Sequence, residues 1–117
     1  MKSSLRILSL LLALAIVSVA GEIRKGATMQ VKADSFWVQD AAKLSLWQQF
    51  KKSGNSKALE AYQDKVLSDR DAWEFTKQLT IRIISYDAAK NQVKVEMQTP
   101  GRLLGSNWFL DAEALMR

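Results

Sequence analysis

Alternating apolar and polar residues predict antiparallel strands in the second half of the chain. Residues 79–86 are apolar at every other position and then change parity, as happens at a β-bulge. A turn is expected over 87–91, and residues 93–97 then alternate strictly between an apolar and a polar face. A short strand at 108–110 and a final helical turn over 112–116 complete the pattern. This order is typical of a three-stranded meander.

The first half contains a strand-like stretch and a long polar connection. Residues 28–38 begin with alternation at Met29 and Val31 and then become irregular and aromatic, so we expect one strand followed by an irregular segment. Residues 68–78, SDRDAWEFTKQ, contain two aromatic residues among charged ones. We interpret them as a polar connection that leads into the meander.

Between these stretches the period changes to that of a helix. Residues 39–53 predict an amphipathic helix that Asp40 caps and Gly54 ends. The residues that fall on its apolar side are Ala42, Lys43, Leu46, Trp47 and Phe50, with Leu44 at the margin. Asn55 or Ser56 then caps a second helical pattern. The two helices are expected to form a hairpin inserted over about residues 39–68, and ordinary packing accounts for both apolar stripes.

The N-terminus has the pattern of a secretory signal peptide. Lys2 and Arg6 precede an uncharged apolar run over 7–17, and small residues follow up to Ala20. The run is shorter than the roughly 20 residues that a membrane-spanning helix needs, so we predict cleavage after Ala20 rather than a permanent anchor. The mature chain would be one domain over residues 21–117, in the periplasm or outside a bacterial cell. The alternative is an uncleaved anchor.

The charged residues favour a soluble surface. The net charge of +5 falls to +3 if Lys2 and Arg6 are removed with the signal peptide. Such a charge suits the anionic polymers of a cell envelope, but acidic and basic residues are interspersed, as on ordinary soluble surfaces. No stripe of lysine and arginine interleaves with the tryptophans, so nucleic-acid binding is not expected.

The absence of histidine and cysteine limits the available chemistry. It excludes Ser-His-Asp and Cys-His nucleophilic sites, common zinc sites and thiol redox function. Asp69, Asp71 and Glu74 are the best remaining candidates for a cation site or for paired carboxylates, but Arg70 sits among them and the ligand register of a calcium loop is missing. We interpret them as solvated charges and expect no enzyme activity, no metal and no cofactor.

The segment from Leu79 to Leu115 is similar to the second half of bacterial SH3-like (SH3b-type) domains. Gly101, Gly105, Trp108 and Leu110 stand where that family has a glycine-bearing turn and a short aromatic strand. Two residues, Ser106 and Asn107, separate Gly105 from Trp108 where the family has none, and the helical hairpin replaces an extended loop. The resemblance implies an α+β, mostly β fold: a small SH3-like antiparallel barrel with an inserted two-helix hairpin.

The aromatic residues and one loop provide the candidate binding residues. Trp47 and Trp108 are expected in the core, whereas Trp37 and Trp73 flank the hairpin and are expected either to pin it to the barrel or to line a groove. Phe109 has the opposite parity to Trp108 and is expected to face the groove or the hairpin. The loop that follows Pro100 has no evident structural role, although loops often carry ligand contacts. The candidate ligand-binding residues are Trp37, Arg70, Trp73, Arg102, Leu103, Leu104 and Phe109.

Two functions from different classes fit these patterns. The first is an exported, monomeric and non-catalytic binding module with an aromatic groove, for which the resemblance implies peptides or peptidoglycan fragments as ligands. The second is a protein-partner module, such as an inhibitor of a periplasmic hydrolase, that uses the hairpin or a loop as a wedge. An enzyme acting through carboxylates is a third and weaker alternative.

Overall fold

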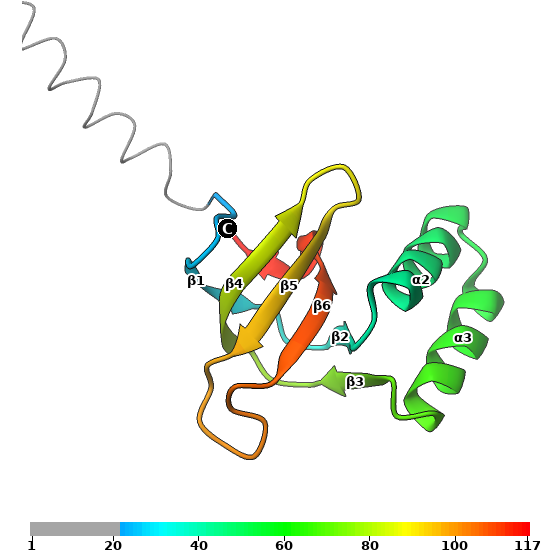
Figure 1. Cartoon of the computed structure of the whole chain (residues 1–117). Coiled ribbons are helices and arrows are strands. Elements are labelled where there is room, and N and C mark those ends of the chain that lie inside the picture. The colour runs from blue at the N-terminus through cyan, green and yellow to red at the C-terminus, as the bar shows by residue number, and fades with distance from the viewer. Residues whose placement is uncertain (1–21) are drawn as a thin grey trace, which may run out of the picture.

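Seven strands form one antiparallel sheet in the computed structural model, which describes residues 22–117 (Figure 1). The strands are β1 (Thr28–Val31), β2 (Ser35–Val38), β3 (Ala72–Phe75), β4 (Leu79–Asp87), β5 (Gln92–Met97), β6 (Asn107–Asp111) and β7 (Leu115–Met116). Helices α2 (Ala41–Ser53) and α3 (Ser56–Ser68) connect β2 to β3, and the 3-10 helix η1 (Ala112–Ala114) precedes β7. The signal peptide predicted over residues 1–20 lies outside the described residues.

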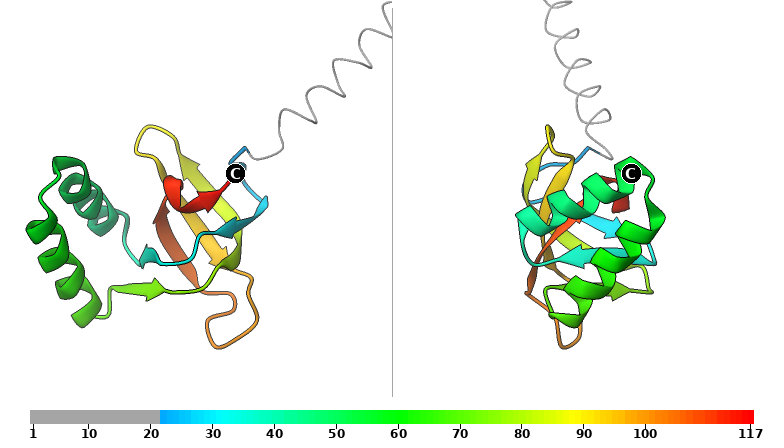
Figure 2. Two further views of the ribbon diagram at one scale, coloured as in Figure 1. Left: turned by 180° about the vertical axis from the view of Figure 1, so that it is seen from behind. Right: turned by 90° about the vertical axis from the view of Figure 1, so that its right-hand side faces the viewer.

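The sheet is curved but open. Its strand order is β3-β2-β6-β5-β4-β1-β7, so β3 and β7 form two edges that do not pair with each other. Leu115 of β7 nevertheless belongs to the main core, and Phe75 of β3 packs against the same core. The sheet therefore bends around this main core (Figure 2). The predicted α+β class with two inserted helices is confirmed, whereas the predicted closure into a barrel is not observed.

The main core is built from the alternating positions of the meander. Its buried residues are Met29, Val31, Trp37, Ile81, Ile83, Val93, Val95, Met97, Trp108, Leu110, Ala112 and Leu115. The register between β4 and β5 shifts between Ile83 and Ser85, which confirms the predicted bulge. Leu115 then pairs with Val31 as part of β7, so the expected helical turn over 112–116 is right only for η1.

The predicted connection over residues 68–78 is wrong in its middle, because residues 72–75 form strand β3. β3 pairs with β2, and Trp73 lies opposite Trp37. β2 is itself a separate strand, since the chain turns at Asp34, whose φ of 58° is in the left-handed region. β2 is buried at all four of its positions and so shows no alternation, and β3 is a four-residue strand with both of its central residues exposed, so neither shows the alternation that predicts a strand.

The two helices begin and end where their capping residues predict. The Asp40 carboxylate accepts hydrogen bonds from the backbone N–H groups of Ala42 and Lys43 at 2.7 and 3.1 Å. Gly54 ends α2 with a φ of 75°, and the Asn55 side chain caps α3. The predicted helical hairpin is confirmed.

The hairpin packs on β2 and β3 through a second, smaller core. Its buried residues are Phe36, Val38, Leu44, Trp47, Val66 and Ala72. Leu44 is fully buried while Leu46 is 44% exposed, which reverses their predicted places on the helix. The reason is that α2 packs on the strands through the face that carries Leu44 and Trp47, which are one turn apart. Leu46 lies outside this face and is exposed to solvent.

Candidate functional site

Trp37 lies in the interior of the sheet. Its side chain is 0% exposed, and its ring meets Phe75 edge-on with the ring centroids 4.8 Å apart. The indole Nε1–H donates to the hydroxyl of Ser35 at 2.7 Å, so its polar group is already satisfied. The prediction that Trp37 lines a ligand groove is therefore wrong for this structure. Trp37 instead packs beneath Phe75 from the buried side of the sheet.

Trp73 is the exposed partner of this pair. It lies opposite Trp37 on the edge strand β3 and is 54% exposed, while the other three tryptophans are buried. Its ring is tilted against that of Phe75, with the centroids 6.5 Å apart. A half-exposed indole held against a second aromatic ring is a typical anchor for a binding partner.

A small apolar hollow of about 260 Å³ continues from Phe75 toward the loop between β5 and β6. Leu79 and Met97 line it together with Pro100, and Arg102 and Leu103 border it from the loop. Trp73, Phe75 and this hollow are named the aromatic surface below. Phe75 was not predicted as a site residue, because β3 was not identified from the sequence. The signal that could have found it is the spacing of two between Trp73 and Phe75, which places both side chains on one face of a strand.

Hydrogen bonds fix the shape of the loop. The Ser106 hydroxyl accepts from the Trp108 indole at 2.7 Å and donates to the carbonyl of Leu103 at 2.5 Å. The backbone N–H of Gly105 donates to the Met97 carbonyl at 2.9 Å, with Gly105 at a φ of 84° that favours glycine. One of the two residues that depart from the SH3-like pattern, Ser106, thus holds the loop onto the core.

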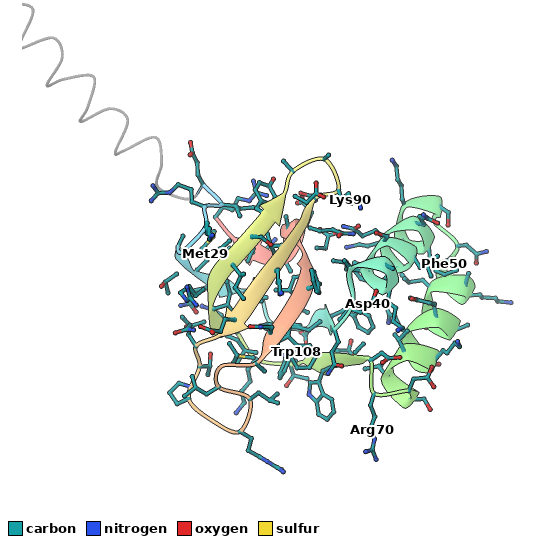
Figure 3. The ribbon with its side chains drawn as sticks, viewed as in Figure 1. Met29, Asp40, Phe50, Arg70, Lys90 and Trp108 are labelled. Atoms are coloured by element: carbon teal, nitrogen blue, oxygen red, sulfur yellow. The ribbon has the colours of Figure 1, made fainter. Side chains whose placement is uncertain are left out.

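The structure brings only some of the predicted residues together. Trp73, Arg102 and Leu103 belong to the aromatic surface, and Leu104 is 57% exposed beside them in the chain. Arg70 lies just before β3 and points away from the fold (Figure 3). Phe109 packs against the second core beneath the helices, with the Lys94 ammonium 5.8 Å from its ring centroid. Phe109 therefore faces the hairpin, which is one of the two orientations that the sequence predicted for it.

The charged groups near β3 do not form a metal centre. Asp71 pairs with Lys43 at 3.5 Å, and no three acidic side chains within residues 22–117 converge on a common point that would suit a cation. Two pKa values shift elsewhere. A hydrogen bond from Arg82 lowers the pKa of Glu96, and burial together with the charges of Asp40 and Asp71 raises the pKa of the Tyr62 hydroxyl. Neither Glu96 nor Tyr62 borders the aromatic surface.

Among residues 22–117 there is no helix with the length and apolar character that a membrane crossing requires. Comparisons of the chain with protein-family models, with curated proteins and with solved structures found no match.

Proposed function

We propose that this protein is an exported, non-catalytic binding module whose aromatic surface recognises an extended peptide, either free or as part of a peptidoglycan fragment. One observation carries the proposal: Trp73 is half exposed on an edge strand, and its ring is tilted against Phe75, which lines an apolar hollow. The sequence resemblance of Leu79 to Leu115 to SH3-like domains supports it, since that resemblance implies peptides or peptidoglycan fragments as ligands.

The open edge of β3 provides the polar part of such a site. Within the described residues β3 pairs with β2 alone, so the N–H and C=O groups along its other edge are free to accept an added strand. Trp73 and Phe75 lie on one face of this strand at a spacing of two, which matches the alternate side chains of an added peptide. Main-chain hydrogen bonds would give affinity, and the hollow would select an apolar side chain.

The Arg102 guanidinium favours a ligand with a carboxylate. Arg102 borders the hollow and is in no ion pair within the described part of the chain. An unpaired guanidinium can bind a carboxylate through two parallel hydrogen bonds. A peptide with an acidic residue or a free C-terminus beyond its apolar anchor therefore fits best.

Binding experiments with a matched variant test the proposal. Tryptophan fluorescence is recorded while soluble peptidoglycan fragments, and separately a panel of short peptides with an apolar residue and a terminal carboxylate, are added. Trp73→Ala should weaken binding by roughly 30-fold or more, as expected for about 2 kcal/mol at an aromatic anchor. Leu46→Ala removes an exposed apolar side chain of α2 and should leave binding unchanged. Equal effects of the two substitutions would refute the site.

The loop supports the second candidate function, inhibition of a hydrolase by a protein wedge. Leu104 is 57% exposed, and the loop that carries it projects beyond the sheet while its base is fixed by Ser106 (Figure 1). A loop that is held in one shape and carries an exposed apolar residue resembles the loops that protein inhibitors insert into their targets, because it is ordered before binding. Leu104→Asp should abolish capture of a stoichiometric envelope hydrolase, whereas it should leave binding of peptides to Trp73 in place.

A further inference from the structure

A second hollow lies between α2 and the turn that joins β4 to β5, at the opposite end of β5 from the aromatic surface. Its volume is about 780 Å³, a size typical of sites for small molecules. The α2 wall includes Gln48, Lys51 and Lys52, and the facing wall includes Lys90, Asp111 and Glu113. Figure 3 shows Lys90 at this turn, above the strands and beside the side chains of α2. This hollow is named the polar cleft below.

A hydrogen-bond network fixes the floor of the polar cleft. The Gln48 amide donates to the Asp111 carboxylate at 3.0 Å and to the Asn91 carbonyl at 3.2 Å, and it accepts from the buried Gln92 side chain at 2.9 Å. The Asn91 amide donates to Asp111 at 3.4 Å and to Glu113 at 3.2 Å. Each carboxylate retains further lone pairs that can accept hydrogen bonds. The floor is thus rigid and offers acceptors in fixed positions before any ligand arrives.

Three lysines border the polar cleft without an acidic partner. Across residues 22–117 the ion pairs are Lys43 with Asp71 and Arg82 with Glu96, so the ammonium groups of Lys51, Lys52 and Lys90 are unpaired. The Lys51 ammonium lies 4.9 Å from the ring centroid of Trp47. Unpaired cations that line a concavity attract an anionic group.

An adjoining hollow of about 360 Å³ lies at the C-terminal half of α2 and shares Lys51, Asp111 and Glu113 with the polar cleft. The stacked rings of Phe36 and Trp47 border this adjoining hollow. The residues that line the polar cleft itself are polar or charged apart from Ala89, so it offers no apolar anchor of the kind that most peptide-binding sites use.

We infer that the polar cleft binds a short anionic saccharide. Its carboxylate or phosphate group would lie against Lys51, Lys52 and Lys90, and its hydroxyl groups would donate to the free lone pairs of Asp111 and Glu113. A purely acidic peptide fits less well, because the two carboxylates on the floor would repel it, whereas a sugar hydroxyl can both donate to a carboxylate and accept from an ammonium group. The inference does not depend on the aromatic surface, since the two sites share no residue.

The four tryptophan indole N–H signals in a 15N NMR spectrum separate the two sites. Trp47 reports on the polar cleft, because its ring lies under Lys51, and Trp73 reports on the aromatic surface. Trigalacturonate or glucose 1-phosphate should shift the Trp47 signal saturably and leave the Trp73 signal in place. Maltotriose, a neutral control, should bind at least about tenfold more weakly, because it lacks the charge-assisted hydrogen bonds. A response to only one of the anionic probes would support the inference and identify the acid group as carboxylate or phosphate.

A charge-matched pair of double variants tests the lysines. Lys52→Gln with Lys90→Gln should weaken binding of the anionic probe by at least about tenfold through loss of two charge-assisted contacts. Lys57→Gln with Lys65→Gln removes the same charge from exposed positions of α3 that line neither hollow, and should change affinity less than about twofold because salt screens exposed charges. Equal weakening by both double variants, absence of any saturable shift at Trp47, or equal affinity for inorganic phosphate would each overturn the inference. A shift at Trp73 alone would overturn it while leaving the peptide site intact.

Discussion

Trp37 and Trp73 lie directly opposite each other across β2 and β3, yet Trp37 is 0% exposed and Trp73 is 54% exposed. The difference arises from their places in the sheet. The Trp37 ring packs into the main core against Phe75 and Trp108, whereas Trp73 lies on the edge strand β3. Phe75 touches both indoles and connects the interior to the surface. The buried indole thus supports the ring against which the exposed one rests.

Substitutions at these two tryptophans should separate stability from binding. Trp37→Ala is expected to lower the free energy of unfolding by about 3–5 kcal/mol, because it leaves a cavity in the main core. Trp73→Ala should cost less than about 1 kcal/mol, as is usual for surface positions. Urea unfolding followed by circular dichroism measures both. If Trp37→Ala does not fold, Trp37→Phe should still cost more than Trp73→Ala, and the reverse order would contradict the assignment.

Ser106 is expected to stabilise the fold through its hydroxyl. Ser106→Ala leaves the largely buried Trp108 indole N–H without its partner, which should lower the free energy of unfolding by about 1–3 kcal/mol. Ser68→Ala, at an exposed position in α3, is the matched control and should have little effect. Differential scanning calorimetry gives the two shifts in Tm. Identical Tm values for both variants would show that the loop is held in another way.

The N-cap of α2 should contribute measurably to stability. Asp40→Ala removes the two hydrogen bonds that its carboxylate accepts and should cost about 1 kcal/mol. Asp64→Ala removes an equal charge from the exposed side of α3 and serves as the control. Chemical unfolding monitored by far-UV circular dichroism compares them, since α2 and α3 give the helical signal. A larger loss for the Asp64 variant would contradict the capping role.

Stability should fall at acidic pH partly through Glu96. The Arg82 hydrogen bond at 3.0 Å lowers the pKa of Glu96 in the folded state. Its contribution is therefore complete above the ordinary glutamate pKa of about 4.3 and is lost as the pH falls through the lowered value. Glu96→Gln should flatten this part of a stability curve measured from pH 7 to pH 2. An unchanged curve would show that other carboxylates account for the acid sensitivity.

Most of the fold was predictable because its longer elements have regular periodicity. The short strands β2 and β3 were not predictable in this way. The alternation in β4 and β5 and the caps Asp40 and Gly54 are local signals, so the sequence reveals them directly. The exposure of Leu46 depends on which line of α2 meets the strands, and that line is set by tertiary packing. β3 is an edge strand of four residues. It is too short and too exposed for the pattern of apolar and polar residues to predict a strand.

The candidate site was predictable only in part for the same reason. Trp73, Arg102 and Leu103 were identified because aromatic residues and loops commonly bind ligands. Phe75, which joins them, follows only once β3 is known. The polar cleft depends on contacts between Gln48 and Asp111, which are 63 residues apart in the chain, and no local pattern predicts such a contact.

The central claim is that a peptide adds to the open edge of β3 and covers Trp73. Hydrogen–deuterium exchange of the backbone amides, measured with and without a bound peptide from the fluorescence panel, tests this most directly. The account predicts slower exchange in residues 72–75 together with a shift of the Trp73 indole signal, while amides of the β4–β5 turn stay unchanged. Protection confined to the β4–β5 turn or to the helices, with no change in residues 72–75, would contradict it.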